Sequence, residues 1–218
     1  MTAIIFDCDG VLVDSEVLAL EIELTSLKEI GLEFDVEAYQ KRHLGTTSAE
    51  FFCEIGNDYR AKFGEPLPEG FPERVGARYR EAFSTRLEVI PGVHVALQSV
   101  SAPMAVASGS SPAGLRQKLT HADLIQFFGE HVYSSHQVEH GKPAPDLFLF
   151  AANALGVDPA TCVVIEDSAK GVQAAVSAGM RAIGFTGGGH CLPGHGEGLL
   201  AEGAERVVSH MEYLSAAL

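Results

Sequence analysis

The chain has 218 residues, and its composition of 46% hydrophobic and 20% charged residues is typical of a globular protein. Its formal net charge of −14 gives a field that repels polyanions, so we expect neither a nucleic acid nor an anionic membrane as a partner. The four cysteines are far apart and residues 1–7 carry no basic or long apolar segment, so we expect a cytoplasmic protein with free thiols.

The first predicted element is a strand at residues 3–6, because this short apolar run ends abruptly at Asp7 and is typical of a strand buried on both faces. Residues 15–86 then contain no strand-like run. Amphipathic patterns separated by glycine and proline predict helices in this part of the chain, at residues 15–30, 36–43, 48–63 and 72–83.

Strand and helix patterns alternate after residue 86. Apolar runs predict strands at residues 104–107, 162–165 and 182–185, with an edge strand at 207–208, and helices are predicted at 112–120, 145–155 and 168–178. This alternation predicts an α/β fold, a doubly wound, Rossmann-like parallel sheet. The expected core comprises residues 1–14 and 87–218, and residues 15–86 form an inserted all-helical domain.

Two carboxylates follow the first predicted strand, Asp7 and Asp9, and Gly10 allows a sharp turn that brings both toward one centre. Ligands of open α/β sheets bind at the carboxyl ends of the strands, which is where these residues stand. The Asp-x-Asp-Gly pattern alone is weak evidence, since it also occurs in half of a calcium loop or at a polar strand end.

A second acidic pair, Glu166 and Asp167, follows the strand predicted at 162–165. Carboxylates gathered at one sheet edge repel one another unless a cation compensates them, and a few hard oxygen ligands favour Mg²⁺. The alternative is that the pair caps the helix that begins near Ser168.

Ser108 and Gly109 precede the helix that Pro112 would start, so a hydroxyl and backbone N–H groups form a candidate anion site. Lys142 lies on a stiff, proline-flanked segment and offers a charge that could neutralise a carboxylate and a phosphoryl group. Each feature alone also fits an ordinary loop or a solvated surface lysine.

Together these segments resemble the four ordered motifs of the haloacid dehalogenase superfamily, at residues 7–14, 106–110, 141–146 and 164–171. The inserted helices look like the α-helical cap of its phosphoglycolate phosphatase and β-phosphoglucomutase branch. Within that branch, residues 14–17 and 101–108 are most similar to bacterial 6-phosphogluconate phosphatases and other sugar-phosphate phosphatases.

The resemblance implies a magnesium-dependent phosphatase that acts on a small phosphorylated metabolite, a sugar or sugar-acid phosphate, through a phospho-aspartyl intermediate. Asp7 would be the nucleophile, and Asp9 would protonate the leaving alcohol and then deprotonate water. The implied Mg²⁺ ligands are Asp7, the backbone carbonyl of Asp9 and Asp167, with Glu166 acting through a water. Ser108, Gly109 and Lys142 would bind the phosphoryl group.

Two other activities remain as alternatives. A β-phosphoglucomutase-type mutase is disfavoured, because that family has a histidine in the cap where this sequence has Ala19, and its cap-loop arginine is replaced near Thr47 or Ser48. An aspartate-phosphorylated regulatory protein also gathers carboxylates, a hydroxyl and a lysine, but it lacks a helical cap and would give Asp9 no function. Dehalogenases lack the second aspartate.

Substrate selection is expected in the cap, where Arg42, His43 and Thr47 are candidate contacts, although a solvated helix end explains them equally well. The glycine- and histidine-rich segment 186–198 matches no zinc pattern and is predicted to be a mobile loop at the sheet edge, with His190 near the site. We expect a monomer whose cap hinges near residues 14–16 and 85–91.

Overall fold

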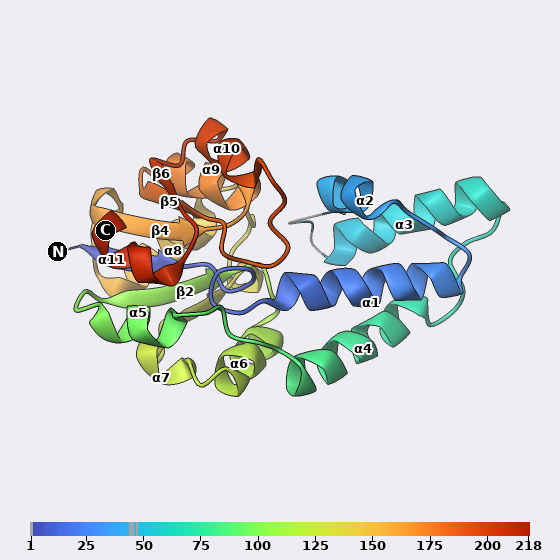
Figure 1. Cartoon of the computed structure of the whole chain (residues 1–218), viewed down its shortest axis with the longest axis horizontal. Helices are drawn as coiled ribbons and strands as arrows, with labels where there is room; N and C mark the ends of the chain where they lie inside the picture. Colours follow the sequence, from blue (N-terminus) through green and yellow to red (C-terminus); the bar gives the residue numbers. More distant parts are fainter. Residues whose placement is uncertain (1, 44–45, 47) are drawn as a thin grey trace.

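The computed structural model describes residues 2–43, 46 and 48–218 (Figure 1). Within these residues six parallel strands form one sheet in the order β3-β2-β1-β4-β5-β6, which confirms the predicted α/β fold class. The strands are β1 (Ala3–Phe6), β2 (Met104–Ser108), β3 (Val132–Ser134), β4 (Cys162–Glu166), β5 (Arg181–Phe185) and β6 (Arg206–Val208).

The strand order reverses direction at β1, which pairs with β2 on one side and β4 on the other. Phe6 is in register with Val106 and with Ile165, so the chain leaves these three strands at the same edge. A topological switch point of this kind opens a crevice at the carboxyl edge of a parallel sheet. The residues that follow the strands therefore meet there.

Alternate side chains of the strands enter two apolar cores, one on each face of the sheet. Ile4 and Phe6 face one core, and Ala3 and Ile5 face the other. The first face is covered by α5 (Val93–Ser99), α6 (Pro112–His121), α7 (Ile125–Phe128) and α11 (Leu214–Ala217). The second face is covered by α8 (Asp146–Leu155), α9 (Ala169–Ser177) and α10 (His195–Ala201).

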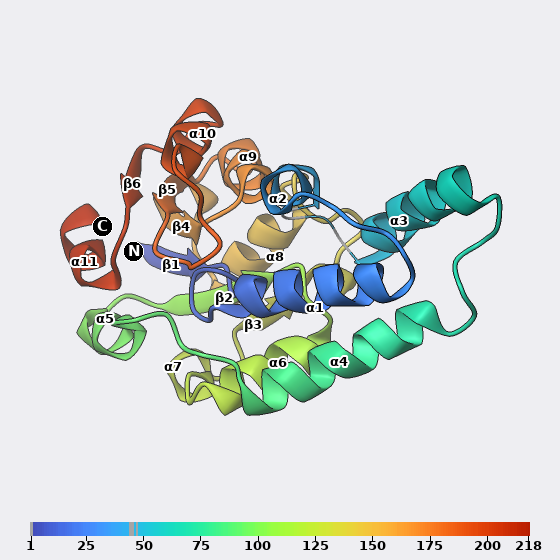
Figure 2. The same ribbon diagram turned by 45° about the vertical axis from the view of Figure 1, so that its right-hand side comes forward.

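The residues between β1 and β2 form helices at the carboxyl edge of the sheet: α1 (Ser15–Glu29), α2 (Val36–His43), α3 (Ser48–Phe63) and α4 (Phe71–Thr85). Both views show them extending beyond the sheet, with α1 and α4 side by side (Figures 1 and 2). They share an apolar core that includes Tyr39, Phe51 and Ile55. We call these helices the cap.

Short connecting elements complete the chain, namely the 3₁₀ turns η1 (Ser135–Gln137), η2 (Pro159–Thr161) and η3 (Met211–Tyr213). None of the helices in the described part of the chain combines the length and apolar character needed to cross a membrane. The sheet edge, α6, α9 and the cap together position the site described next.

Candidate active site

A cavity of about 300 Å³ lies between the carboxyl edge of the sheet and the cap. Core residues on its wall come from the segments that follow β1, β2, β3, β4 and β5 and from α6 and α9, and cap residues come from α1 to α4. The described lining includes Asp7, Asp9, Gly109, Ser110, Lys118, Lys142, Asp167 and His190 from the core side, and Glu16, Glu23, Tyr39, Gln40, His43, Phe51, Tyr79 and Phe83 from the cap side.

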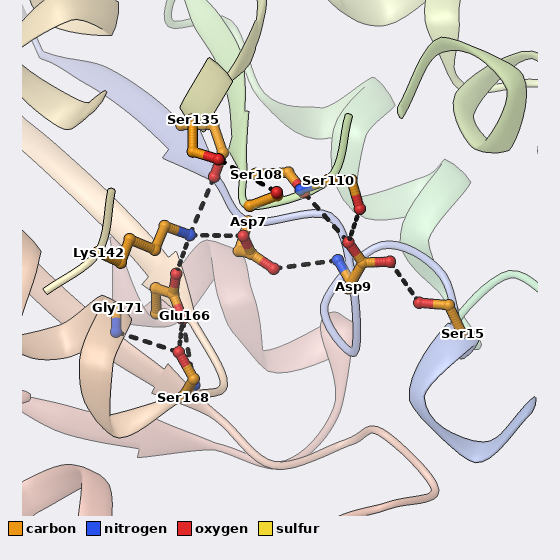
Figure 3. Close-up of polar contacts among 12 residues, drawn as sticks. Asp7, Asp9, Ser15, Ser108, Ser110, Ser135, Lys142, Glu166, Ser168 and Gly171 are labelled. Atoms are coloured by element: carbon orange, nitrogen blue, oxygen red, sulfur yellow. Dashed lines mark hydrogen bonds and ion pairs between the residues drawn. The ribbon is translucent and has the colours of Figure 1, made fainter. Parts of the chain in front are cut away.

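Asp7 directly follows β1 and is buried at the floor of this cavity. Lys142 Nζ donates to Asp7 Oδ1 at 2.5 Å, and the backbone N–H of Asp9 donates to Asp7 Oδ2 at 3.0 Å (Figure 3). Burial raises the pKa of Asp7 well above its ordinary value; the charge of Lys142 opposes this, and three neighbouring carboxylates reinforce it. The ionised Asp7 therefore needs more positive charge than Lys142 alone supplies.

Asp9 is held by a dense set of donors. The hydroxyls of Ser15, Ser110 and Ser108 donate to its carboxylate at 2.5, 2.8 and 3.1 Å (Figure 3). Lys118 Nζ forms an ion pair with the same carboxylate. Burial raises the pKa of Asp9, but the charge of Lys118 and these hydrogen bonds outweigh burial and hold the pKa at about 2. Asp9 is therefore a carboxylate in this arrangement.

Lys118 was not among the residues predicted for the site. It comes from α6, is 4% exposed, and also donates to Ser110 Oγ at 2.7 Å. Its neighbours on the helix, Leu115 and Leu119, are buried, so Lys118 occupies the apolar face. The sequence could have indicated this residue, because a lysine on the apolar face of a predicted helix must be buried, and a buried ammonium group requires a charged or polar partner.

Lys142 connects Asp7 to Glu166. Besides Asp7, its ammonium group donates to the carbonyl oxygen of Ala107 at 3.0 Å and forms an ion pair with Glu166 (Figure 3). Desolvation lowers the pKa of Lys142, but the two carboxylates outweigh it and raise the pKa above its ordinary value. Lys142 is therefore a fixed cation at the floor of the cavity.

Glu166 is fully buried and accepts hydrogen bonds from the backbone N–H and the hydroxyl of Ser168 at 3.1 and 2.9 Å. It is not among the described residues that line the cavity. Glu166 therefore holds the ammonium group of Lys142 in place. From the sequence we expect only a water-mediated contact with Mg²⁺ for this residue. A Cβ atom at Gly171 of α9 would lie 1.9 Å from Glu166 Cδ, so glycine is required there.

Asp167 lines the cavity and faces His190, whose Nε2 lies 3.1 Å from Asp167 Oδ2. Gly10 has a φ of +75°, and a Cβ atom there would lie 1.9 Å from Asp167 Oδ2. The turn after β1 therefore passes close to Asp167 only because Gly10 has no side chain.

The residues around Asp7 fit a magnesium ion. The donors offered to the cavity by Asp7 and Asp167 are hard carboxylate oxygens, which Mg²⁺ prefers. Burial and then the neighbouring carboxylates raise the pKa of Asp7 by more than Lys142 lowers it, and a divalent cation would stabilise the ionised carboxylate. The residues that would hold the ion are Asp7, Asp167 and the backbone carbonyl of Asp9.

The predicted phosphate-binding residues lie at the same edge. Ser108 is buried, accepts from the backbone N–H of Ser110 at 3.0 Å, and donates to Asp9. Gly109 and Ser110 form the cavity wall itself. The loop after β2 therefore contributes Gly109 and Ser110 to the wall, whereas Ser108, whose hydroxyl donates to Asp9, is not among the described lining residues.

The predicted cap contacts have different positions. His43 is buried and lines the cavity, and burial lowers its pKa, so its imidazole is neutral. Arg42 is not among the described lining residues. Its guanidinium donates to Asp58 at 2.6 and 3.1 Å and lies 3.4 Å from Glu54, because it follows the outer surface of α2 toward α3. Thr47 lies outside the described residues.

The segment expected to be a mobile loop over residues 186–198 is partly helical, since α10 begins at His195. His190 is buried and lines the cavity, and Gln40 of the cap donates to its backbone oxygen at 3.2 Å. Burial lowers the pKa of His190, but contacts with Asp167 and Cys191 outweigh burial and raise it to about 11.

Comparison with known proteins gives one consistent result. A model of the haloacid dehalogenase-like hydrolases matches residues 1–179. A phosphorylated carbohydrates phosphatase of Thermotoga maritima is 34% identical over 218 residues, covering 99% of this chain and 97% of the relative. The 6-phosphogluconate phosphatase of Escherichia coli is 30% identical over 192 residues, covering 88% and 85%.

A solved structure supports the same relationship. A conserved haloacid dehalogenase-like protein of Agrobacterium tumefaciens superposes with a TM-score of 0.88 at 36% identity, covering 100% of this chain and 97% of that one. The family model covers the cap helices and strands β1 to β4, and the solved structure covers the whole chain. The chain belongs to the haloacid dehalogenase-like hydrolase family.

Proposed function

We propose that this protein is a magnesium-dependent phosphatase that hydrolyses a sugar phosphate or sugar-acid phosphate through a phospho-aspartyl intermediate on Asp7. The observation that carries the proposal is the setting of Asp7. Its buried carboxylate lies between Lys142 and the backbone N–H of Asp9, at the floor of a cavity large enough for a small metabolite. The names of the phosphatases described above support the substrate class.

In the first half-reaction Asp7 attacks phosphorus in line while the P–O bond to the leaving alcohol breaks, and that alcohol takes a proton from Asp9. In the second, Asp9 removes a proton from the water that attacks phosphorus, which frees inorganic phosphate and regenerates Asp7. The divalent cation, when bound, supplies charge neutralisation at the phosphoryl oxygens.

The contacts of Asp9 suit it to the second half-reaction, because Lys118 and three hydroxyls hold it as a carboxylate. For the first half-reaction it must be protonated, so its contact with Lys118 has to loosen when substrate binds. Lys142 keeps positive charge beside Asp7 throughout and offsets the repulsion between the nucleophile and an anionic ester.

The test is phosphate release from a panel of sugar phosphates and sugar-acid phosphates, with Mg²⁺ and with excess chelator. We expect many equivalents of phosphate per chain with Mg²⁺ and a loss of at least about a hundredfold with chelator. Asp7→Asn should abolish turnover while the far-ultraviolet circular dichroism stays unchanged. A single labelling event per chain would instead indicate a phosphorylated regulatory protein, and turnover by Asp7→Asn would reject Asp7 as nucleophile.

A further inference from the structure

The cap wall of the cavity contains a carboxylate that bridges two tyrosines from different helices. Glu23 of α1 accepts a hydrogen bond from the hydroxyl of Tyr39 of α2 at 2.9 Å and another from the hydroxyl of Tyr79 of α4. All three residues line the cavity. We call them the Glu23 cluster.

The Glu23 cluster has free hydrogen-bond acceptors but no free donor. Each tyrosine has one hydroxyl proton and uses it on Glu23, and Glu23 accepts one such bond on each carboxylate oxygen. Only lone pairs remain for an occupant of the cavity. The cluster therefore accepts hydrogen bonds from a bound molecule and offers it no proton.

The cations of the cavity are already engaged elsewhere. The described lining contains Lys118, Lys142, Lys170 and His190, the last paired with Asp167, and no arginine. The sequence places no cationic residue at the undescribed positions 44, 45 and 47. Lys118 is paired with Asp9, and Lys142 with Asp7 and Glu166. Lys170 lies at the rim, 3.5 Å from Glu50.

Arg42, the cationic side chain that the sequence suggested as a substrate contact, pairs with Asp58 instead. Glu16 adds a second acidic side chain to the same cap wall. Burial raises the pKa of Glu16 to about 8, so it carries no charge at neutral pH. A carboxylate on the substrate would therefore meet the acceptors of the Glu23 cluster and no free cation, whereas a hydroxyl would meet acceptors to which it can donate.

From this geometry we infer that the Glu23 cluster selects the hydroxyl-bearing, uncharged end of a polyol or sugar phosphate and disfavours a substrate that carries a carboxylate at that end. The inference rests on the proposed phosphatase function and narrows its substrate class. It also separates this chain from the Escherichia coli relative, whose name specifies a sugar-acid phosphate.

The experiment compares glucitol 6-phosphate with 6-phosphogluconate, two six-carbon phosphates that differ at one end by a CH₂OH group against a carboxylate. We expect kcat/KM to be at least about tenfold higher for the hexitol phosphate. Glu23→Gln should reduce that ratio at least about fivefold, because an amide also presents donors. The ratio is measured within one variant, so a general loss of folded protein cancels.

Glu21→Gln is the matched control, because Glu21 is on the same helix but exposed and paired with Arg86. It should leave the ratio unchanged. Equal or faster turnover of 6-phosphogluconate, or an equal effect of both substitutions, would overturn the inference. p-Nitrophenyl phosphate serves as a third, general phosphatase substrate. If no phosphate is released from any of the three esters, the proposed phosphatase function is rejected. If phosphate is released but 6-phosphogluconate is preferred, only the inference about the Glu23 cluster is rejected.

An independent observation concerns the loop after β5. One ligand atom each from His190, Cys191 and His195 lie within 4.8 Å of one another, and Cys191 Sγ is 3.5 Å from His190 Nε2. Tetrahedral zinc, with bonds of about 2.3 Å to sulfur and about 2.1 Å to nitrogen, separates these two atom types by about 3.6 Å. The sulfur and the first nitrogen are therefore already at ligand spacing.

Backbone turns produce this arrangement, which the spacing in the sequence did not indicate. The N–H of Cys191 donates to Gly188 O at 3.1 Å, and the N–H of His195 donates to Leu192 O at 3.0 Å. His190 is buried, while Cys191 and His195 are half-buried, which leaves solvent access for a fourth ligand. A cation would compete with Asp167 for His190 Nε2.

We propose that His190, Cys191 and His195 bind a thiophilic divalent cation such as Zn²⁺, with the Cys191 thiol and the His190 imidazolium each losing a proton to solvent on binding. The probe is Co²⁺ added to the protein in excess Mg²⁺, because only a thiolate ligand gives a sulfur-to-cobalt charge-transfer band. The wild-type protein should develop that band at one equivalent, and Zn²⁺ should remove it.

Cys191→Ser should abolish the band, and Cys53→Ser, which alters an exposed thiol on α3, should retain it. Absence of the band from the wild-type protein, or an equal band in Cys191→Ser, would overturn this second proposal. Neither result bears on the inference about the Glu23 cluster.

Discussion

At the level of single residues, the ion pair with Lys118 sets the charge of Asp9. This ion pair lowers the pKa of Asp9 to about 2, although burial alone would raise it. In Lys118→Met only the serine hydroxyls would still oppose the effect of burial, so the pKa of Asp9 should rise. A base must be ionised to act, so activity should be lost at a higher pH as the solution is acidified.

The measurement is the pH profile of kcat for the wild-type protein and Lys118→Met. We expect the acidic limb to move upward and kcat at neutral pH to fall at least about tenfold. Lys41→Met is the control, since Lys41 is exposed and paired only with Glu37. An unshifted acidic limb in Lys118→Met would mean that Asp9 is not the group that titrates.

Lys142 has a different residue-scale consequence, for stability. Lys142→Met would leave the buried carboxylates of Asp7 and Glu166 without their shared cation. We expect a loss of roughly 3 kcal/mol in the free energy of unfolding in Mg²⁺-free buffer, measured by urea denaturation. Lys41→Met should change it by less than about 0.5 kcal/mol. Equal stability of the two variants would contradict the buried network.

Part of the site was predictable residue by residue. Asp7, Asp9, Lys142 and Asp167 follow strand ends or stand on a stiff segment, so local patterns identify them as candidates. Lys118 was missed because its partner is 109 positions away, and only the packing of α6 against the sheet brings the two together.

At the level of elements, the close approach of α9 to the end of β4 depends on Gly171. A side chain there would collide with Glu166, so Gly171→Ala should lower the free energy of unfolding by about 3 kcal/mol. The same change should displace Glu166 from Lys142 and reduce activity. Gly198→Ala in α10, where nothing lies within 4 Å, should be neutral or slightly stabilising. Thermal and urea unfolding measure both.

The elements that the sequence did not predict are short. Strand β3 has only three residues and α5 and α10 have seven each, too few for a clear hydrophobic period. The longer helices α2 and α3 coincide with their predicted ranges. The cap wall was missed for another reason: Glu23, Tyr39 and Tyr79 come from separate helices, and no local pattern relates them.

At the scale of the whole molecule, the net charge of −14 opposes the approach of an anionic ester. Raising the ionic strength from about 10 mM to about 150 mM shortens the screening length from about 30 Å to about 8 Å. With Mg²⁺ saturating, kcat/KM should therefore rise about two- to fivefold. Initial rates in increasing KCl test this. A fall in kcat/KM would show that local positive charge dominates the encounter.

The attachment of the cap to the sheet has one more consequence. Ser15 is the first residue of α1, and its hydroxyl donates to Asp9, so the first helix of the cap is hydrogen-bonded to the carboxylate for which we propose the acid–base role. A rotation of α1 that opens the cavity to water would also lengthen or break the hydrogen bond from Ser15 to Asp9. A movement of the cap that opens or closes the cavity would thus also change the hydrogen bonding of Asp9, because both depend on the start of α1.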